Sequence, residues 1–264
     1  MRLIDTHAHL YAEQFDKDRA AMIARAREVG VRQFFLPNID RNSIPGMLEL
    51  EKKYPGQCFA MMGLHPCSVK EDYEQELAAV RKWLDKRSFA AVGEIGIDLY
   101  WDKTFFEQQK DAFLKQVHWA KELDLPIVIH SREATDIIID LLAALPEGTA
   151  RGIFHCFGGS PEQARRIIDL GFYLGIGGVV TFKKSGLDKT LAEIDLEHLV
   201  LETDAPYLAP TPYRGKRNES AYIYKVAEKI AEIKERELEE VAQITSRNAD
   251  AIFSLSAAAM KDAE

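Results

Sequence analysis

The chain of 264 residues contains few cysteines and no long apolar segment. Its three cysteines, Cys58, Cys67 and Cys156, form no Cys-x-x-Cys pair, and their odd number argues against a disulfide framework. No apolar run approaches the roughly 20 residues that a membrane-spanning helix needs, and the N-terminus lacks the apolar core of a signal peptide. We therefore expect a cytoplasmic protein with reduced thiols and no contact with a membrane.

The sequence also lacks an excess of positive charge and two common catalytic motifs. Asp and Glu number 42 against 34 Lys and Arg, so the net charge is -8 and no global basic field attracts nucleic acid. No Gly-x-Gly-x-x-Gly lies between a strand and a helix, which weakens a dinucleotide-binding hypothesis. No Gly-x-Ser-x-Gly elbow is present either. A polyanionic substrate would have to be recruited locally, by a metal or a small basic patch.

Short apolar segments alternate with helical patterns along the whole chain. Strand–helix alternation implies a parallel sheet with right-handed crossovers. Eight such units in about 250 residues predict an α/β fold of the (β/α)8 TIM-barrel type, with a doubly wound sheet as the alternative. We expect residues 1–264 to form one domain. The apolar segments predicted to form strands are 3–4, 34–37, 59–66, 89–96, 127–130, 152–157, 172–176 and 199–204.

The helical patterns carry recognisable start and stop signals. The pattern over 15–30 ends at Gly30, a residue that often terminates helices. Ser160, Pro161 and Gln163 have the spacing of an N-cap, a first-turn proline and a capping box. Helices are also expected before residue 54, around Trp83, over 104–123 and 134–145, and in the C-terminal tail.

Polar residues recur near the C-terminal ends of the apolar segments. Barrel enzymes place their chemistry at this end of the strands. His7 and His9 share a face because side chains on a strand alternate with a period of two, and imidazoles on one face can chelate a divalent metal. The full set at the strand ends is His7, His9, His65, Glu94, His130, His155 and Asp204.

These residue types fit a centre with two metal ions. His7, His9 and Asp204 could hold one ion, His130 and His155 another, and the two oxygens of Glu94 could bridge them. Two ions roughly 3.5–4 Å apart would clamp an attacking water and a leaving oxygen during hydrolysis. Asp204 could also act as a general base. Histidine ligands favour Zn²⁺ or Mn²⁺, whereas phosphoryl substrates usually bring Mg²⁺.

Cationic and aromatic residues follow the same strands. Arg132 comes two residues after His130, while Arg214, Lys216 and Arg217 follow the eighth segment, where barrels often bind phosphate. Aromatic rings that stack on bases contribute roughly 1–3 kcal/mol each. Tyr100, Trp101, Tyr207 and Tyr213 are placed to do so.

Taken together, these motifs resemble the TatD family of metal-dependent hydrolases over essentially the whole chain. The matching stretches are 5–9 (Asp-Thr-His-Ala-His), 63–66 (Gly-Leu-His-Pro), 93–98 (Gly-Glu-Ile-Gly-Ile-Asp), 126–132, 155–159, 201–207 and 214–219. The resemblance implies a barrel with two divalent ions: one held by His7, His9, Glu94 and Asp204, the other by Glu94, His130 and His155. His65, Arg132 and Glu202 also match motif positions near the metals, and we place them, with Arg214, as substrate-binding residues.

Relatives in this family are described as deoxyribonucleases, some acting 3′→5′ on single strands. We therefore expect a metal-dependent hydrolase of phosphodiester bonds, with single-stranded DNA ends as substrate, no obligate protein partner and a monomeric state. Two stretches depart from the family pattern, one at Ser131 and Glu133 and the other at Ser220, and neither departure removes a ligand. The alternatives are an amidohydrolase or lactonase of a small carbonyl compound, which the same metals would serve, and a barrel that binds metals without catalysis.

Overall fold

The computed structural model describes residues 1–253, in which parallel strands alternate with helices. Hydrogen-bonded neighbours follow the chain order, β1-β2-β3 in one sheet and β4-β5-β6-β7-β8 in another. Backbone hydrogen bonds cross both breaks, from Ala90 N to Ala60 O (2.9 Å) and from Thr6 N to Leu201 O (3.0 Å). This ring confirms the predicted (β/α)8 barrel over the doubly wound sheet. The strands are β1 (Leu3–Asp5), β2 (Val31–Pro37), β3 (Cys58–Met61), β4 (Val92–Asp98), β5 (Ile127–Arg132), β6 (Gly152–Phe154), β7 (Phe172–Ile176) and β8 (Leu199–Leu201).

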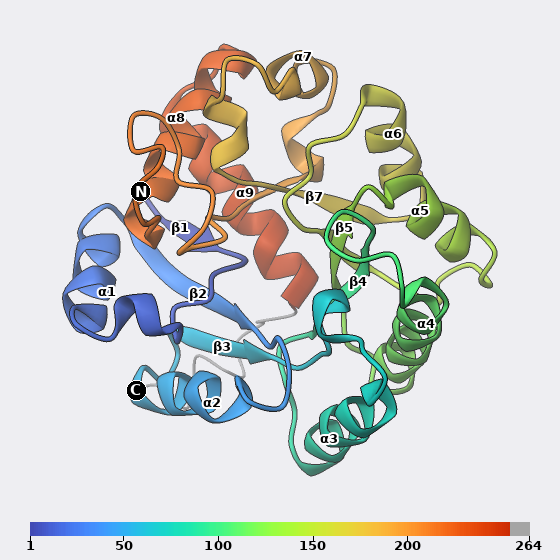
Figure 1. Ribbon diagram of the computed structural model, residues 1–264. Coiled ribbons are helices and arrows are strands. Elements are labelled where there is room, and N and C mark those ends of the chain that lie inside the picture. Colours follow the sequence, from blue (N-terminus) through green and yellow to red (C-terminus); the bar gives the residue numbers. More distant parts are fainter. Residues whose placement is uncertain (254–264) are drawn as a thin grey trace.

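Helices surround the ring of strands, and α9 crosses the centre of the view in Figure 1. The expected cap of α6 is present: Ser160 Oγ accepts from Gln163 N, and Gln163 Oε1 accepts from Ser160 N. Among the described residues, none of the helices combines the length and apolar character that crossing a bilayer requires. The helices are α1 (Arg19–Glu28), α2 (Ile44–Lys53), α3 (Tyr73–Lys86), α4 (Phe106–Glu122), α5 (Thr135–Ala143), α6 (Pro161–Asp169), α7 (Leu187–Ala192), α8 (Ile223–Lys234) and α9 (Leu238–Phe253).

Apolar side chains that point into the barrel form a floor against α9. Phe253 of α9 stacks on Phe35 of β2, with ring centroids 3.7 Å apart. The floor closes the amino ends of the strands, and it leaves the carboxyl ends for the polar residues. Its buried members are Ile4, Phe35, Met61, Ala91, Val128, Ile153, Val200, Ala249, Ile252 and Phe253.

Side chains alternate along each strand with a period of two, and this places polar residues next to the floor on the inward face. His130, His155 and Glu202 follow Val128, Ile153 and Val200 by two positions, so each shares the inward face. Glu94 is different, because simple alternation from Ala91 would turn it outward. A register shift between Gly93 and Ile95 changes the alternation and turns Glu94 inward.

Several strands end earlier than the apolar segments predict. β3 ends at Met61, β6 at Phe154 and β8 at Leu201, so His65, His155 and Asp204 lie in the loops that follow. Cys156 and Asp204 have positive φ angles of 48° and 55°, a left-handed conformation that cannot continue a strand. The helix expected from residue 15 begins at Arg19, after a short 3-10 turn over Glu13–Phe15.

Candidate metal centre

Backbone hydrogen bonds hold the first two histidines against the end of β8. Asp204 N donates to His7 O (2.9 Å), and His9 N donates to Ala205 O (2.8 Å). Asp5 fixes the same junction, because its carboxylate accepts from Thr203 N at 3.0 Å and Thr203 Oγ1 at 2.6 Å. The Asp-Thr-His-Ala-His stretch therefore places His7 and His9 beside Asp204, which lies almost 200 residues away in the sequence.

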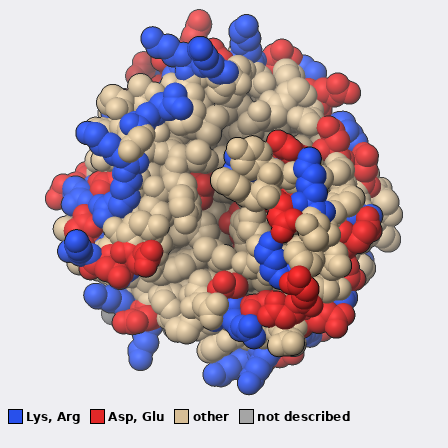
Figure 2. Space-filling model, in the orientation of Figure 1, with Lys and Arg blue, Asp and Glu red and all other residues tan. Residues whose placement is uncertain are grey.

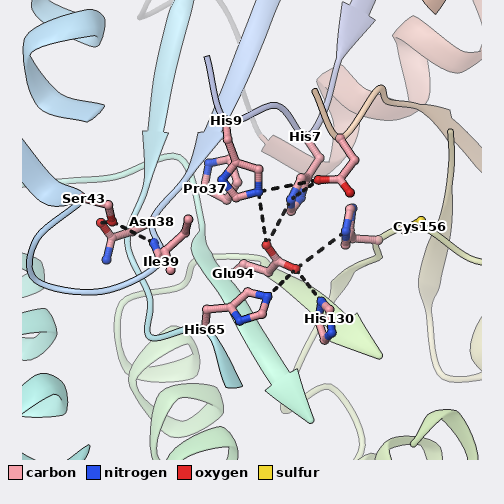
Figure 3. A network of polar contacts seen from close by, with 12 residues as sticks. His7, His9, Pro37, Asn38, Ile39, Ser43, His65, Glu94, His130 and Cys156 are labelled. Atoms are coloured by element: carbon pink, nitrogen blue, oxygen red, sulfur yellow. Dashed lines mark hydrogen bonds and ion pairs between the residues drawn. The ribbon is translucent and has the colours of Figure 1, made fainter. Parts of the chain in front are cut away.

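Glu94 lies at the centre of the histidines (Figure 3). Its side chain is 2% exposed. One oxygen, Oε2, is 3.1 Å from His7 Nε2 and 3.7 Å from His9 Nε2. The other, Oε1, is 2.8 Å from His130 Nδ1 and 3.6 Å from His155 Nε2. The two oxygens thus face the two groups of histidines that the sequence assigns to separate ions.

Asp204 closes the cluster on the side of His7 and His9. Its Oδ1 lies 3.6 Å from His9 Nε2 and 3.9 Å from His7 Nε2. The side chain of Asp204 is 14% exposed, more than that of Glu94. All six predicted metal ligands therefore converge on one volume, with Asp204 on its solvent side.

The histidine nitrogens that face this volume are free to bind a cation. Tyr11 donates its hydroxyl proton to Pro37 O (2.6 Å), so its oxygen accepts from Nδ1–H of His9 (3.1 Å). The proton on Nδ1 leaves Nε2 of His9 as a lone pair directed at Glu94 and Asp204. Within residues 1–253, both ring nitrogens of His7 are buried and have no hydrogen-bond partner. Such unpaired buried groups fit a centre that is completed by metal.

Carboxylates contact the outer nitrogens of the other two histidines. Asp98 Oδ2 accepts from His130 Nε2 at 2.9 Å. Glu202 Oε1 lies 2.9 Å from His155 Nδ1 without forming a hydrogen bond, so this nitrogen is also unpaired within residues 1–253. Metal-binding histidines commonly have a carboxylate on the nitrogen that does not bind the ion. The pattern therefore fits metal binding through Nδ1 of His130 and Nε2 of His155.

His65 has a different hydrogen-bond pattern from the six ligands. Its Nδ1 accepts from Cys67 N (3.0 Å), so in the neutral ring Nε2 carries the proton. That Nε2 lies 3.4 Å from Glu94 Oε1. The neutral ring is thus arranged to donate a hydrogen bond at the edge of the cluster.

Burial and mutual charge shift the pKa values of these groups. Burial raises the pKa of Asp204 to about 6. Burial would also raise the pKa of Glu94, but the nearby His65, His7 and His155 outweigh it and hold that pKa well below its usual value. Burial disfavours the charged form of His130, yet its bonds to Asp98 and Glu94 prevail and raise its pKa to about 9. Each of these pKa shifts has a cause within the cluster itself, and such shifts are typical of functional sites.

The donor atoms are close enough to hold divalent ions. Around Glu94, three donors at a time lie within 4.8 Å of one another. One such set, His7, His155 and Asp204, joins residues that the sequence assigns to different ions, and the rings of His7 and His155 stack with centroids 3.5 Å apart. The division of the ligands between two ions therefore stays a prediction. The other sets here are His7, His9 and Glu94, and His65, Glu94 and His130.

The cluster forms part of the lining of a cavity of about 770 Å³. Arg132 lines it, with its guanidinium carbon 3.8 Å from the Tyr100 ring centroid and 5.3 Å from that of Trp101. Arg214 lines it too, 4.0 Å from the Phe182 ring centroid. The face in Figure 2 is hollowed near its centre, and charged side chains of both signs lie around its periphery.

Two predicted substrate contacts have other surroundings in the structure. Arg217 pairs with Asp18 through both terminal nitrogens (2.6 and 2.8 Å) and also donates to Gln14 O, so its role is structural. Glu202 has no exposed surface and accepts from Cys156 N (2.6 Å) beside His155. A residue buried in this way has no surface to offer a substrate, and the geometry fits a role in positioning His155.

Sequence reasoning assigned no role to Asp98 or Tyr11, although both contact predicted ligands. Asp98 carried a detectable signal, because it follows Glu94 by four positions and residues at that spacing share a face of a strand. Tyr11 carried none, since its contact depends on how the chain turns after β1.

Almost the entire chain matches proteins of one family. The family model described as TatD related DNase matches residues 4–254. The chain belongs to the TatD family. It is 42% identical over 252 residues to an uncharacterized metal-dependent hydrolase, YabD, of Bacillus subtilis, covering 95% of this chain and 98% of YabD.

Other TatD-family members match over similar lengths. The chain is 33% identical to the 3′-5′ ssDNA/RNA exonuclease TatD of Salmonella typhimurium, covering 95% of this chain and 98% of that protein. The crystal structure of YjjV, a TatD homologue from Escherichia coli, superposes with a TM-score of 0.90 at 32% identity, covering 96% of this chain and 98% of YjjV. This protein is therefore a metal-dependent hydrolase of the TatD family with a TIM-barrel fold.

Proposed function

We propose that this TatD-family hydrolase cleaves phosphodiester bonds, as a deoxyribonuclease that shortens single-stranded DNA from the 3′ end. The observation that carries the proposal is that one cavity joins the metal-ligand cluster to Arg132, Arg214 and Lys216. Guanidinium and ammonium groups match phosphate oxygens in charge and hydrogen bonding. A small neutral carbonyl substrate would need none of these cations.

The proposed centre holds two divalent ions, Mg²⁺, Mn²⁺ or Zn²⁺. His7, His9, Glu94 and Asp204 would hold one, and Glu94, His130 and His155 the other. Ions bound there would polarise a phosphoryl oxygen and lower the pKa of the attacking water. The free Nε2 of His9 and the unpaired nitrogens of His7 support this ligand set.

Asp204 and His65 are placed to move or share protons during the reaction. The pKa of Asp204, raised to about 6 by burial, lies closer to neutrality than that of an ordinary carboxyl, as a general base requires. Because His65 lines the cavity with a protonated Nε2, it can donate a hydrogen bond to a phosphoryl oxygen. Glu202 would orient His155 and make no contact with substrate.

The position of the cluster favours the end of a single strand. Glu94 and His155 are 2% and 5% exposed, at the bottom of the cavity, where the stacked bases of a duplex would keep the backbone at a distance. Trp101 and Tyr207 also line the cavity and are 69% and 48% exposed, so their rings are available to stack on unpaired bases. The naming of TatD relatives from Salmonella typhimurium and Yersinia pseudotuberculosis as 3′-5′ ssDNA/RNA exonucleases supports the same substrate. The cytoplasmic location, single domain and monomeric state stay predictions from the sequence.

The test uses metal-stripped protein to which Mg²⁺, Mn²⁺ or Zn²⁺ is returned. Single-stranded oligonucleotides labelled at the 3′ or the 5′ end report both cleavage and its direction. We expect rapid loss of a 3′ label and gradual shortening of the 5′-labelled strand. Glu94→Gln removes one carboxylate oxygen from the centre and should abolish the cleavage.

Glu76→Gln is the matched control, because Glu76 is also a buried glutamate but pairs with Arg41 outside the cavity. It should cleave like the unchanged protein. If no metal supports cleavage of DNA, the nuclease proposal is wrong. Hydrolysis of lactones, esters or amides under the same conditions would then identify the amidohydrolase-type alternative.

A further inference from the structure

The carboxylate of Asp98 contacts both the metal-ligand cluster and the loop beside it. Asp98 is the last residue of β4 and is 1% exposed. Its Oδ2 lies 2.9 Å from His130 Nε2. Its Oδ1 accepts from the backbone nitrogens of Tyr100 (2.9 Å) and Trp101 (3.1 Å). One buried side chain therefore joins a predicted metal ligand to the loop that carries two exposed aromatic rings.

The backbone of Asp98 is itself fixed by a buried amide. Gln109 of α4, 3% exposed, accepts from Asp98 N at 2.8 Å and donates to Asp98 O at 3.2 Å. The backbones of β4 and β5 lie close together here, since a Cβ at Gly96 (φ 151°) of β4 would overlap the carbonyl oxygen of His130 on β5. Asp98 and His130 are thus held at a defined separation by their own backbones.

We propose that Asp98 is a positioning residue that sets the tautomer of His130 and couples this ligand to the Tyr100–Trp101 loop. A carboxylate can only accept hydrogen bonds, so Nε2 of His130 must carry the proton beside Asp98. In the metal-free structure Nδ1 also donates, to Glu94 Oε1 (2.8 Å), and it is the nitrogen that would give up its proton and bind the ion while Asp98 keeps the proton on Nε2. The proposal concerns the metal centre and holds whatever the substrate is.

The same contact has a consequence for the cavity wall. Arg132 follows His130 on β5 and stacks on the Tyr100 ring, with Trp101 5.3 Å away. Order in the loop and metal binding at His130 are therefore linked through Asp98, and linkage of this kind works in both directions. Metal binding should slow hydrogen exchange of the loop amides, and loosening the loop should weaken metal binding.

Asp98→Asn separates the two roles of the carboxylate. Asparagine keeps an oxygen for the amides of Tyr100 and Trp101, but its NH₂ group would face Nε2 of His130. The ring must then accept at Nε2 and carry its proton on Nδ1, where it blocks the ion. We expect calorimetric titration of metal-stripped protein with Mn²⁺ and Zn²⁺ to show affinity for one ion lowered about 10- to 100-fold.

His118→Gln, a change on the surface of α4 away from the cluster, is the control, and it should keep the unchanged affinity for both metals. Unchanged affinity in Asp98→Asn would overturn the proposal. A structural role alone would lower the melting temperature without changing the tautomer, so ¹⁵N-histidine spectra of the Zn²⁺-loaded wild-type protein give an independent test. A proton on Nε2 and metal on Nδ1 of His130 are expected. The reverse arrangement would overturn the proposal even if the variant does not fold.

Hydrogen exchange followed by mass spectrometry tests the link to the loop. Asp98→Ala removes both oxygens, so amides in residues 99–105 should exchange faster than in the unchanged protein. Asp98→Asn should keep their protection. Equal exchange in the alanine variant and the unchanged protein would show that Asp98 does not hold the loop.

Discussion

The two ends of the barrel bury side chains of opposite character. At the amino ends, apolar residues from the strands pack against Ile252 and Phe253 of α9. At the carboxyl ends, which we call the mouth, the same inward faces carry His130, His155 and Glu202. Burying a polar group without a partner costs roughly 1–3 kcal/mol, yet both nitrogens of His7 and Oε2 of Glu202 are unpaired within residues 1–253. We infer that the floor stabilises the fold. The buried unpaired polar groups of the mouth lower the stability of the metal-free protein, and they are the groups that would bind metal.

This contrast predicts the largest effect for Asp204→Asn. Asparagine is a poor general base and a weak metal ligand, so hydrolysis should fall about 10²- to 10⁴-fold. The free energy of unfolding of the metal-free protein, by contrast, should rise or stay the same. The folded-state pKa of Asp204, about 6, lies above the ordinary value of 3.8, so its ionised form is disfavoured in the folded protein at higher pH.

The metal-free asparagine variant should therefore be at least as stable as the unchanged protein at pH 8. The difference should shrink as the pH falls from about 6 to below 4, where Asp204 is protonated in both states. Denaturant unfolding at several pH values measures it. A variant that is both inactive and strongly destabilised at pH 8 would show that Asp204 also supports the fold, and the two ends would differ less than we propose.

The floor should show the converse behaviour. Phe253→Ala removes a ring that is 5% exposed and stacked on Phe35. Truncation of a buried phenylalanine lowers the free energy of unfolding by about 3–5 kcal/mol. The turnover number of the protein that remains folded should not change, because Phe253 lies at the opposite end from the cavity. Phe253→Leu, which keeps most of the apolar volume, should lose less stability, and a fall in turnover for either variant would connect floor and mouth.

Most residues of the metal-ligand cluster could be predicted from the sequence, but two of the features around it could not. The six converging residues, four histidines with Glu94 and Asp204, could be predicted because each lies near the C-terminal end of an apolar segment, and that position can be read locally from the sequence. Glu94 converges only through a register shift in β4, which depends on packing against β5 and leaves no mark in the residue pattern. Arg217 was predicted as a phosphate contact, but in the structure it forms an ion pair with Asp18. That partner lies in a distant segment of the chain, so the sequence pattern around Arg217 does not reveal it.

A third prediction concerns protons at the mouth. The pKa of His130 is raised to about 9 in the metal-free protein, so at pH 7 the ring is protonated and must release a proton to bind an ion. Metal affinity should thus rise as the pH increases from 7 to 9, by up to about tenfold per unit, and level off above that range. Below about pH 6, protonation of Asp204 should weaken binding further.

Calorimetric titration in buffers of different ionisation enthalpy counts the released protons directly. His118→Gln is the control, because His118 lies on the surface of α4 with Nδ1 2.7 Å from Leu114 O and should not alter the count. Affinity that is constant between pH 7 and 9 would mean that His130 is neutral before metal binds.

The smallest expected effect compares two arginines that follow β8. Arg214 lines the cavity, whereas Arg217 is paired with Asp18. Arg214→Ala should raise the KM for a single-stranded oligonucleotide about 10- to 100-fold, since a charge-assisted hydrogen bond contributes roughly 1.5–3 kcal/mol. It should also make binding less sensitive to salt, because one phosphate contact is lost.

Arg217→Ala should leave the KM and the salt dependence unchanged and lower stability by no more than about 1 kcal/mol, as for other partly exposed ion pairs. The two variants carry the same change of charge, only three positions apart. A general loss of positive potential would therefore raise the KM in both. A rise confined to Arg214→Ala would show that the substrate is held by a contact inside the cavity, whereas equal effects would mean that the cations at the mouth act only through their field.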